Sequence, residues 1–113
     1  MKLASLSAIA LFAIAACSSS DSAGDKCKDN CRATCEGEEA PTAAELVNCD
    51  NECDAIQTRT EKQACEDELA ALFDCAEENQ CKATFAADCN EQSEELEACT
   101  LAYCRAHTSD PDC

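Results

Sequence analysis

The sequence predicts an all-α protein made of small disulfide-stapled helical hairpins, with about four helices. Three observations support this prediction. β-branched and aromatic residues are sparse and never alternate with polar ones, so there is hardly any strand signal. Helix-capping residues recur along the chain. Cysteines repeat at spacings of four residues, which places them on one face of a helix.

The N-terminus predicts a signal peptide over residues 1–16. Met1 and Lys2 form a short positively charged region, and Leu3 to Ala16 is an uncharged, mostly apolar stretch. A stretch of about 14 residues is shorter than the roughly 20 that a helix needs to cross a bilayer. We therefore expect an export signal and not a membrane span.

The end of this segment, Ile14-Ala15-Ala16-Cys17, resembles the lipobox of bacterial lipoproteins. The resemblance implies that the Cys17 sulfur carries a diacylglycerol and that a peptidase cleaves before it. Ser18 is similar to the residue that follows the cysteine in the outer-membrane class. The resemblance thus implies an exported protein, lipid-anchored in the bacterial cell envelope at the outer membrane. The alternative is ordinary signal cleavage, with Cys17 as one more disulfide cysteine.

The charge of the chain argues against nucleic acid as a partner. It has 8 basic and 24 acidic residues, a formal charge of -16, and cleavage before Cys17 would remove Lys2 and make the charge -17. Such a surface repels phosphate backbones and anionic lipid headgroups. Soluble cations and basic proteins remain possible partners, and the acidity can also serve only to keep the protein soluble.

The apolar core is too thin to hold the fold alone. From residue 27 onward there are ten large apolar side chains, and each contributes roughly 2 kcal/mol when buried. Ordering the backbone costs about 1 to 2 kcal/mol per residue. Setting Cys17 aside, 12 of the 13 cysteines remain, enough for six disulfides in an exported domain.

The predicted elements follow from local signals. Residues 17–26 are Ser-rich and predict a flexible tether after the lipidated cysteine. The cysteine-rich helical domain spans 27–113. Asp25 is the expected cap of a first helix over about 26–36, which Gly37 would end. Thr42 and Glu45 form a capping box for a second helix that runs to about residue 56.

A third and a fourth helix complete the prediction. Thr58 with Glu61, or Thr60 with Gln63, gives a start signal for a helix that ends near residue 79. Asn90 opens a fourth helix to about residue 107. One apolar stripe of the third helix is expected to pack on the fourth as core and not as a cofactor site; its residues are Leu69, Leu72, Phe73 and Ala76, facing Leu96, Cys99 and Tyr103.

Cysteines on one helix face should bond across to a neighbouring helix, because side chains four residues apart point the same way. The spacing Cys31-x3-Cys35 followed by Cys49-x3-Cys53 is similar to the twin CX3C arrangement of stapled helical hairpins. This resemblance implies the pairs Cys31–Cys53 and Cys35–Cys49.

The cysteines of the second half of the chain, from Cys65 onward, allow two sets of nested disulfide pairs. Cys65-x9-Cys75 and Cys89-x9-Cys99 look superficially like a twin CX9C arrangement, which would pair Cys65 with Cys99 and Cys75 with Cys89. We favour a turn centred near Phe85 instead. That nesting gives the pairs Cys81–Cys89, Cys75–Cys99, Cys65–Cys104 and Cys27–Cys113. Sequence alone does not determine connectivity.

Signals of catalysis and of cofactor binding are absent from the sequence. His107 is the only histidine, so no Ser/His/Asp constellation exists, and two glycines cannot form a phosphate loop. No Cys-x2-Cys pair of the zinc or redox type occurs. The acidic cluster of Asp50, Glu52 and Asp54 is expected to be a solvated helix face. We therefore expect no catalytic residue, no metal site and no cofactor.

Taken whole, the chain resembles small, cysteine-rich bacterial lipoproteins, most of them uncharacterised. The expected role is that of a non-enzymatic, lipid-anchored envelope protein that presents a rigid acidic module, either structural or binding a protein partner. Two alternatives remain open. One is a metal-binding or redox-buffering protein. The other is an inhibitor or effector that uses the loop from Glu38 to Thr42.

Overall fold

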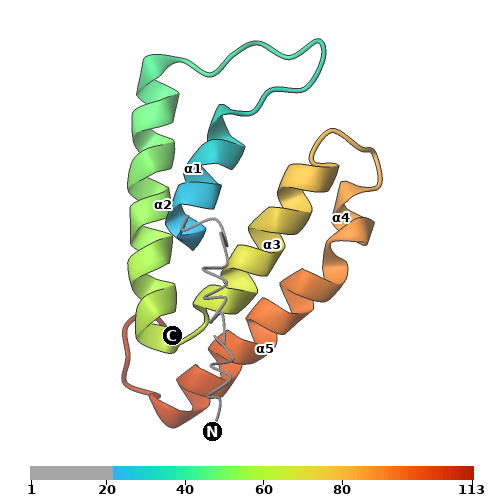
Figure 1. The fold of residues 1–113 in the computed structure, drawn as a ribbon. Coiled ribbons are helices and arrows are strands. Elements are labelled where there is room, and N and C mark those ends of the chain that lie inside the picture. Colours follow the sequence, from blue (N-terminus) through green and yellow to red (C-terminus); the bar gives the residue numbers. More distant parts are fainter. Residues whose placement is uncertain (1–21) are drawn as a thin grey trace, which may run out of the picture.

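The computed structural model describes residues 22–113, and within them the chain forms five helices and no strand (Figure 1). The prediction of an all-α, disulfide-stapled fold is confirmed. The expected signal peptide, Cys17 and the tether up to residue 21 lie outside the described residues.

Helix α1 (Ala23–Arg32) begins earlier than predicted. The Ser22 Oγ accepts a hydrogen bond from the Asp25 N–H at 3.2 Å, and the Asp25 carboxylate accepts one from the Ser22 N–H. This capping box starts the helix inside the expected tether, so residues 23–26 are helical. The helix also ends four residues before Glu36, the expected last residue.

Helix α2 (Ala43–Gln63) starts where predicted and runs seven residues further. The Thr42 Oγ1 accepts from the Glu45 N–H at 3.2 Å, and the Glu45 carboxylate accepts from the Thr42 N–H at 2.9 Å. Thr58 and Thr60 do not cap a new helix. Their hydroxyls donate to backbone carbonyls one turn back within α2, so both residues remain inside this helix.

The second half contains a long helix on each side of a short one. Helix α3 (Glu66–Asn79) ends as predicted, and α5 (Asn90–Ala106) agrees with the fourth predicted helix. Helix α4 (Phe85–Asp88) was not predicted and forms a single turn between them.

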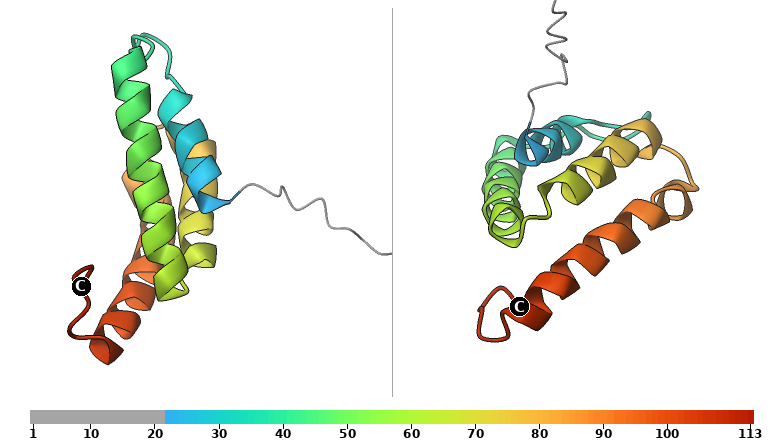
Figure 2. Two further views of the ribbon diagram at one scale, coloured as in Figure 1. Left: turned by 90° about the vertical axis from the view of Figure 1, so that its left-hand side faces the viewer. Right: turned by 60° about the horizontal axis from the view of Figure 1, so that its bottom comes forward.

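The helices run alternately up and down. Helix α1 lies against both α2 and α3, and α5 packs on α3 away from most of α2 (Figure 2). The buried apolar residues are few: Ala23, Cys27, Cys53, Cys65, Leu69, Cys75, Ala76 and Cys89. Five of these eight are cysteines, so disulfides provide much of the core as well as cross-linking it. Leu72 and Phe73 of the predicted stripe are only half-buried.

Candidate functional site: the disulfide cluster between helices α1 and α2

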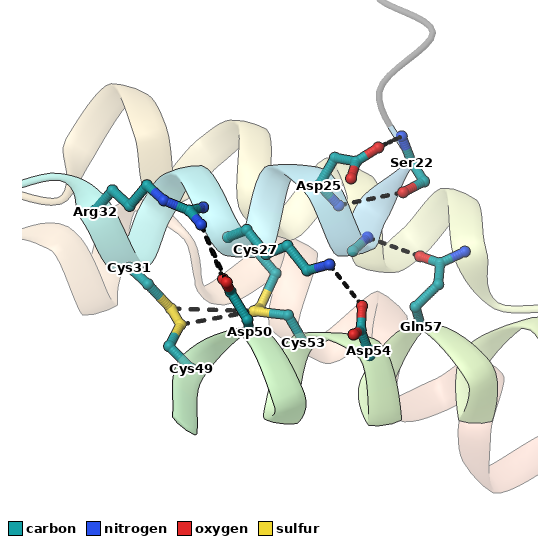
Figure 3. The surroundings of a disulfide bond; sticks show 12 residues. Ser22, Asp25, Cys27, Cys31, Arg32, Cys49, Asp50, Cys53, Asp54 and Gln57 are labelled. Atoms are coloured by element: carbon teal, nitrogen blue, oxygen red, sulfur yellow. Dashed lines mark hydrogen bonds and ion pairs between the residues drawn. A yellow bond between two sulfur atoms is a disulfide. The ribbon is translucent and has the colours of Figure 1, made fainter. Parts of the chain in front are cut away.

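Two disulfides join α1 to α2 side by side (Figure 3). Cys27 pairs with Cys53, and Cys31, one turn along α1, pairs with Cys49, one turn back along α2. Their Cα–Cα distances are 5.6 and 6.3 Å. Because the two helices are antiparallel and both cysteine spacings are four residues, the two bonds stack along the same helix interface.

The four sulfur atoms form one cluster. The Cys53 Sγ lies 4.0 Å from the Cys31 Sγ and 3.8 Å from the Cys49 Sγ, although neither is its bonded partner. Cys53 is fully buried and Cys27 is nearly so, with 6% of its surface exposed. Cys31 and Cys49 are half-buried. The cluster therefore has an outer disulfide between two half-buried cysteines and an inner disulfide between two buried ones.

Two ion pairs also join the two helices beside the sulfur atoms, and Figure 3 shows the one between Arg32 and Asp50. Lys28 contacts Asp54 at 2.6 Å, and Arg32 contacts Asp50 at 3.1 Å. The hydrogen bond to Asp54 raises the pKa of Lys28 above its usual value. Asp50 and Asp54, expected as part of a solvated acidic face, thus serve as partners of basic residues on α1.

At the start of α1, the helices approach closely. The Gly24 N–H donates to the Gln57 Oε1 at 2.7 Å, and a Cβ added at Gly24 would lie 3.1 Å from the Gln57 Cβ. Glycine therefore permits this close approach, because a Cβ at position 24 would require Gln57 to move by a few tenths of an ångström.

All six favoured disulfide pairings are wrong. The structure pairs Cys27–Cys53, Cys31–Cys49, Cys35–Cys81, Cys65–Cys99, Cys75–Cys89 and Cys104–Cys113. The predicted pairs that it replaces are Cys31–Cys53, Cys35–Cys49, Cys65–Cys104, Cys75–Cys99, Cys81–Cys89 and Cys27–Cys113.

The first half differs because of where α1 lies in the sequence. Helix α1 ends at Arg32, so Cys35 lies in the following loop and reaches Cys81, in the loop after α3. The hairpin therefore uses Cys27 and Cys31, which shifts its register by one helical turn from the predicted one. The spacing is still Cys-x3-Cys on both helices.

In the second half, the nesting that we did not favour is the one that forms. Cys65 pairs with Cys99 and Cys75 with Cys89, as the twin CX9C resemblance implied. Cys81 is engaged with the first half of the chain, so it does not pair with Cys89. The C-terminal tail folds back on its own helix and joins Cys113 to Cys104, which leaves neither for a more distant partner.

Within residues 22–113, two groups of side chains have metal-ligand atoms close together. The sulfur atoms of Cys27, Cys31 and Cys53 lie within 4.8 Å of one another, and so do those of Cys65 and Cys99 with a Glu68 carboxylate oxygen. Each of these cysteines is bonded in a disulfide. A disulfide sulfur is not the thiolate that zinc takes as a ligand, so in this oxidised form neither group is a thiolate site.

Two hollows line the inner side of α5. One, of about 460 Å³, is largely apolar and is lined by residues of α3 and α4 together with the start of α5, among them Leu72, Phe73, Ala76, Phe85 and Ala86. The other, of about 480 Å³, lies between α2 and α5. Gln63 lines the second hollow and is 6% exposed, and its Oε1 has no hydrogen-bond partner among the described residues.

The C-terminal tail is held by a small polar cluster. Asp110 accepts hydrogen bonds from the Lys62 Nζ at 2.8 Å and from the Tyr103 hydroxyl at 2.6 Å, and Lys62 also pairs with Asp112. Lys62, followed by Tyr103, lowers the pKa of Asp110 well below its usual value. His107 is exposed and stacks on the Tyr103 ring, with a centroid distance of 4.1 Å.

Comparisons of the chain with known protein families, with curated proteins and with solved structures return no match. Among the described residues, no helix is both long and apolar enough to cross a membrane. Six disulfides are typical of an exported protein in an oxidising environment, and this chain carries them within 87 residues, 27–113.

The sulfur cluster is the feature that sequence reasoning missed. The signal was present, since three cysteines at spacings of four (Cys27, Cys31 and Cys35) precede two at the same spacing on α2. Such a pattern allows two registers that differ by one turn, and only the position of α1 selects between them. Ser22-x-x-Asp25 is the capping signal that could have located the start of α1.

Proposed function

We propose that this chain is a non-enzymatic protein of the bacterial cell envelope, anchored by lipid on Cys17 and presenting a rigid acidic module that is structural or binds a protein partner. The observation that carries the proposal is the division of the cysteines. The 12 cysteines from Cys27 to Cys113 pair among themselves, so none of them is the partner of Cys17.

Cys17 directly follows the predicted signal peptide and is the last residue of the lipobox-like segment that begins at Ile14. Lipid attachment gives it a role that requires no disulfide partner. Two or more acyl chains hold a protein stably on a bilayer, at about 0.8 kcal/mol for each buried CH₂. The module then needs no membrane-binding surface of its own, in keeping with its strongly acidic composition. Ser18 favours the outer membrane as the destination.

The presentation of a protein-binding surface is supported by charge and by the hollows beside α5. A module with a formal charge near -17 attracts basic partners at long range. The apolar hollow lined by Phe73 and Phe85 offers area that a partner can bury. The hollow of about 480 Å³ between α2 and α5 is a second place on this side of the module where a partner can dock.

A second candidate function is an inhibitor or effector loop. The loop between α1 and α2 is exposed from Glu38 to Ala40, and it is fixed at both ends. The Cys35–Cys81 disulfide holds one end, and the Thr42 capping box holds the other. A loop constrained in this way binds with a reduced ordering cost.

The test of lipid anchoring is the mass of the mature N-terminus in a bacterial host that processes lipoproteins. We expect a chain that begins at Cys17, carries acyl mass and fractionates with membranes. The Cys17→Ser variant should lose the acyl mass and leave the membrane fraction. A mature chain with a free thiol at Cys17, or one that begins at another residue, would contradict the anchor.

The presentation of a protein-binding surface is tested separately with the same host. The measurement is the amount of partner protein that is crosslinked to α5. The Phe85→Glu substitution should reduce that amount. Val47→Glu, at an exposed apolar position on α2, is the matched control. Equal effects of the two substitutions would argue for a structural module with no docking surface at the hollow.

A further inference from the structure

The two disulfides between α1 and α2 lie close enough to react with each other. Thiol–disulfide exchange begins when a thiolate attacks a sulfur of a neighbouring disulfide. The Cys31 Sγ lies 4.0 Å from the Cys53 Sγ, on the facing helix (Figure 3). A thiolate formed at Cys31 would therefore already stand beside the sulfur that it attacks.

This closeness sets the α1–α2 pair apart from the other disulfides. Of the disulfides that the structure describes, only Cys27–Cys53 and Cys31–Cys49 have a cysteine sulfur of another disulfide within 4.8 Å of both of their own sulfur atoms. The exposure of the two bonds also differs. Cys31 and Cys49 are half-buried, whereas Cys27 and Cys53 are 6% and 0% exposed.

We propose that these two disulfides form one thiol–disulfide exchange site. An external dithiol reduces the Cys31–Cys49 disulfide, and the reducing equivalents then pass inward to the Cys27–Cys53 disulfide. The substrate class is a small or protein dithiol. The proposal goes beyond the envelope role and does not depend on it, because it concerns only sulfur atoms of the helical body.

The reaction at the outer bond is an ordinary exchange. A thiolate of the dithiol attacks the Cys49 Sγ, forms a mixed disulfide there and expels Cys31 as a thiolate. The second thiol of the substrate then attacks its own sulfur in the mixed disulfide and expels Cys49. The substrate leaves as a disulfide, oxidised by two electrons, and the Cys31–Cys49 bond is reduced.

The transfer inward needs no further electron. The Cys31 thiolate attacks the Cys53 Sγ, the Cys31–Cys53 bond forms and the Cys27–Cys53 bond breaks. Cys27 leaves as a thiolate, and the two protons of the substrate end on Cys27 and Cys49. The product has the Cys31–Cys53 link between the helices.

Cys31 is the attacking residue, although the Cys49 Sγ lies slightly closer to Cys53, at 3.8 Å. Cys49 and Cys53 are four residues apart on α2, so their side chains point the same way from one helix. A disulfide needs Cβ atoms about 4 Å apart that face each other, which favours a bond across the helix interface.

The first test is the Cys27→Ser variant, which frees Cys53. Its thiolate should attack Cys31 and expel Cys49, so incubation above about pH 8.5, the ordinary thiol pKa, should give a Cys31–Cys53 linked peptide and alkylation of Cys49. Cleavage after Glu52 separates Cys49 from Cys53 for mass spectrometry. If Cys53 is the only free thiol and Cys31–Cys49 remains intact, the proposal is overturned.

The matched control is Cys75→Ser, which leaves Cys89 as a buried free thiol at 3% exposure. Since this disulfide has no third sulfur nearby, Cys89 should be the only cysteine alkylated and no new link should appear. Reshuffling in the control equal to that in Cys27→Ser would mean general scrambling, and it would overturn the assignment of exchange to the α1–α2 cluster.

The second test uses the unmodified chain, so it does not depend on the folding of a variant. One equivalent of dithiothreitol is added and the reaction is quenched with acid before alkylation. Among molecules whose Cys31–Cys49 bond has been broken, we expect Cys27 to be alkylated and Cys31 to be linked to Cys53. Alkylation of Cys31 and Cys49 with the Cys27–Cys53 link still intact would refute the inward transfer.

Discussion

Ala64 is the residue at which α2 turns into α3. Its φ is 56°, in the left-handed region, where a side chain costs roughly 1 to 2 kcal/mol. Its N–H still bonds to the Glu61 carbonyl at 3.1 Å, and the next N–H, that of Cys65, reaches the Thr60 carbonyl at 2.9 Å. The strained backbone is therefore held by the hydrogen bonds of a helix end and by the Cys65–Cys99 disulfide.

The Ala64→Gly substitution should raise the free energy of unfolding by about 0.5 to 1 kcal/mol, because the relief of strain exceeds the added entropy of the unfolded chain. Urea denaturation measures it. The matched control is Ala55→Gly at an exposed position inside α2, which should lower the stability by about 1 kcal/mol. A loss of stability in both variants would speak against strain at Ala64.

Asp110 holds the C-terminal tail in a way that depends on pH. Lys62 and Tyr103 lower its pKa below the usual value near 4, so the charged form is favoured in the folded chain. A carboxylate with a lowered pKa stabilises the fold fully above its ordinary pKa, and that contribution is lost as the pH falls through the lowered value. The tail should therefore loosen only in acid well below pH 4.

Tyr103→Phe removes one of the two side-chain donors to Asp110, so the pKa of Asp110 should rise toward its usual value and the tail should loosen at a higher pH. The chemical shift of the Asp110 carboxyl carbon, followed by nuclear magnetic resonance as the pH is lowered, measures the pKa in the unmodified chain and in the variant. The unmodified chain, titrated under the same conditions, serves as the reference. An unchanged Asp110 midpoint in the variant would show that the hydroxyl has no such effect.

At the scale of elements, the α1–α2 hairpin is defined by the capping boxes that begin its two helices and by the two disulfides that join them. Ser22 and Thr42 each begin a helix through a reciprocal capping box, and these two starting points fix which cysteines face each other. The helix α4 turn plays a comparable part in the second half, because it sets the connection between α3 and α5.

Thr42→Ala should lower the free energy of unfolding by about 1 kcal/mol, because the N–H of Glu45 loses its acceptor. Thr58→Ala is the control. Its hydroxyl bonds to the Asp54 carbonyl inside the same helix and caps nothing, so the change should stay within about 0.5 kcal/mol. Thermal or urea denaturation with all disulfides intact distinguishes the two, and equal losses would exclude a capping role for Thr42.

At the scale of the whole molecule, one disulfide ties the two halves together. Cys35–Cys81 links the loop after α1 to the loop after α3 across 46 residues, the largest separation of the six. The remaining disulfides join neighbouring helices or close the tail. The fold therefore consists of two stapled hairpin regions, which share α3 as a packing partner and are cross-linked at one end.

Replacing Cys35 and Cys81 together by serine should lower the free energy of unfolding by about 4 kcal/mol in the chain-entropy model. The same replacement of Cys104 and Cys113, which close a loop of separation 9, should cost about 2.6 kcal/mol. Denaturation of both double variants under non-reducing conditions compares them. A larger loss for the tail pair would show that loop length does not govern stability here.

Much of the architecture followed from local sequence. The strand-poor composition predicted the helical fold. Local signals predicted the start of α2 at the Thr42 capping box, the end of α3 at Asn79 and the start of α5 at Asn90, because capping and propensity act over a few residues. The end of α2 was missed, because the left-handed residue there is Ala64 and not the glycine or asparagine that marks most helix ends.

The pairing of cysteines was decided by tertiary structure. A cysteine repeated every four residues is compatible with registers one turn apart, so a shift in the position of α1 exchanges every partner in the first hairpin. Disulfide connectivity depends on which Cβ atoms come within about 4 Å of each other, and that distance is set by how helices far apart in sequence pack. The sequence by itself determined that this is a stapled helical protein; only the packed helices decided that Cys27, Cys31, Cys49 and Cys53 form one sulfur cluster.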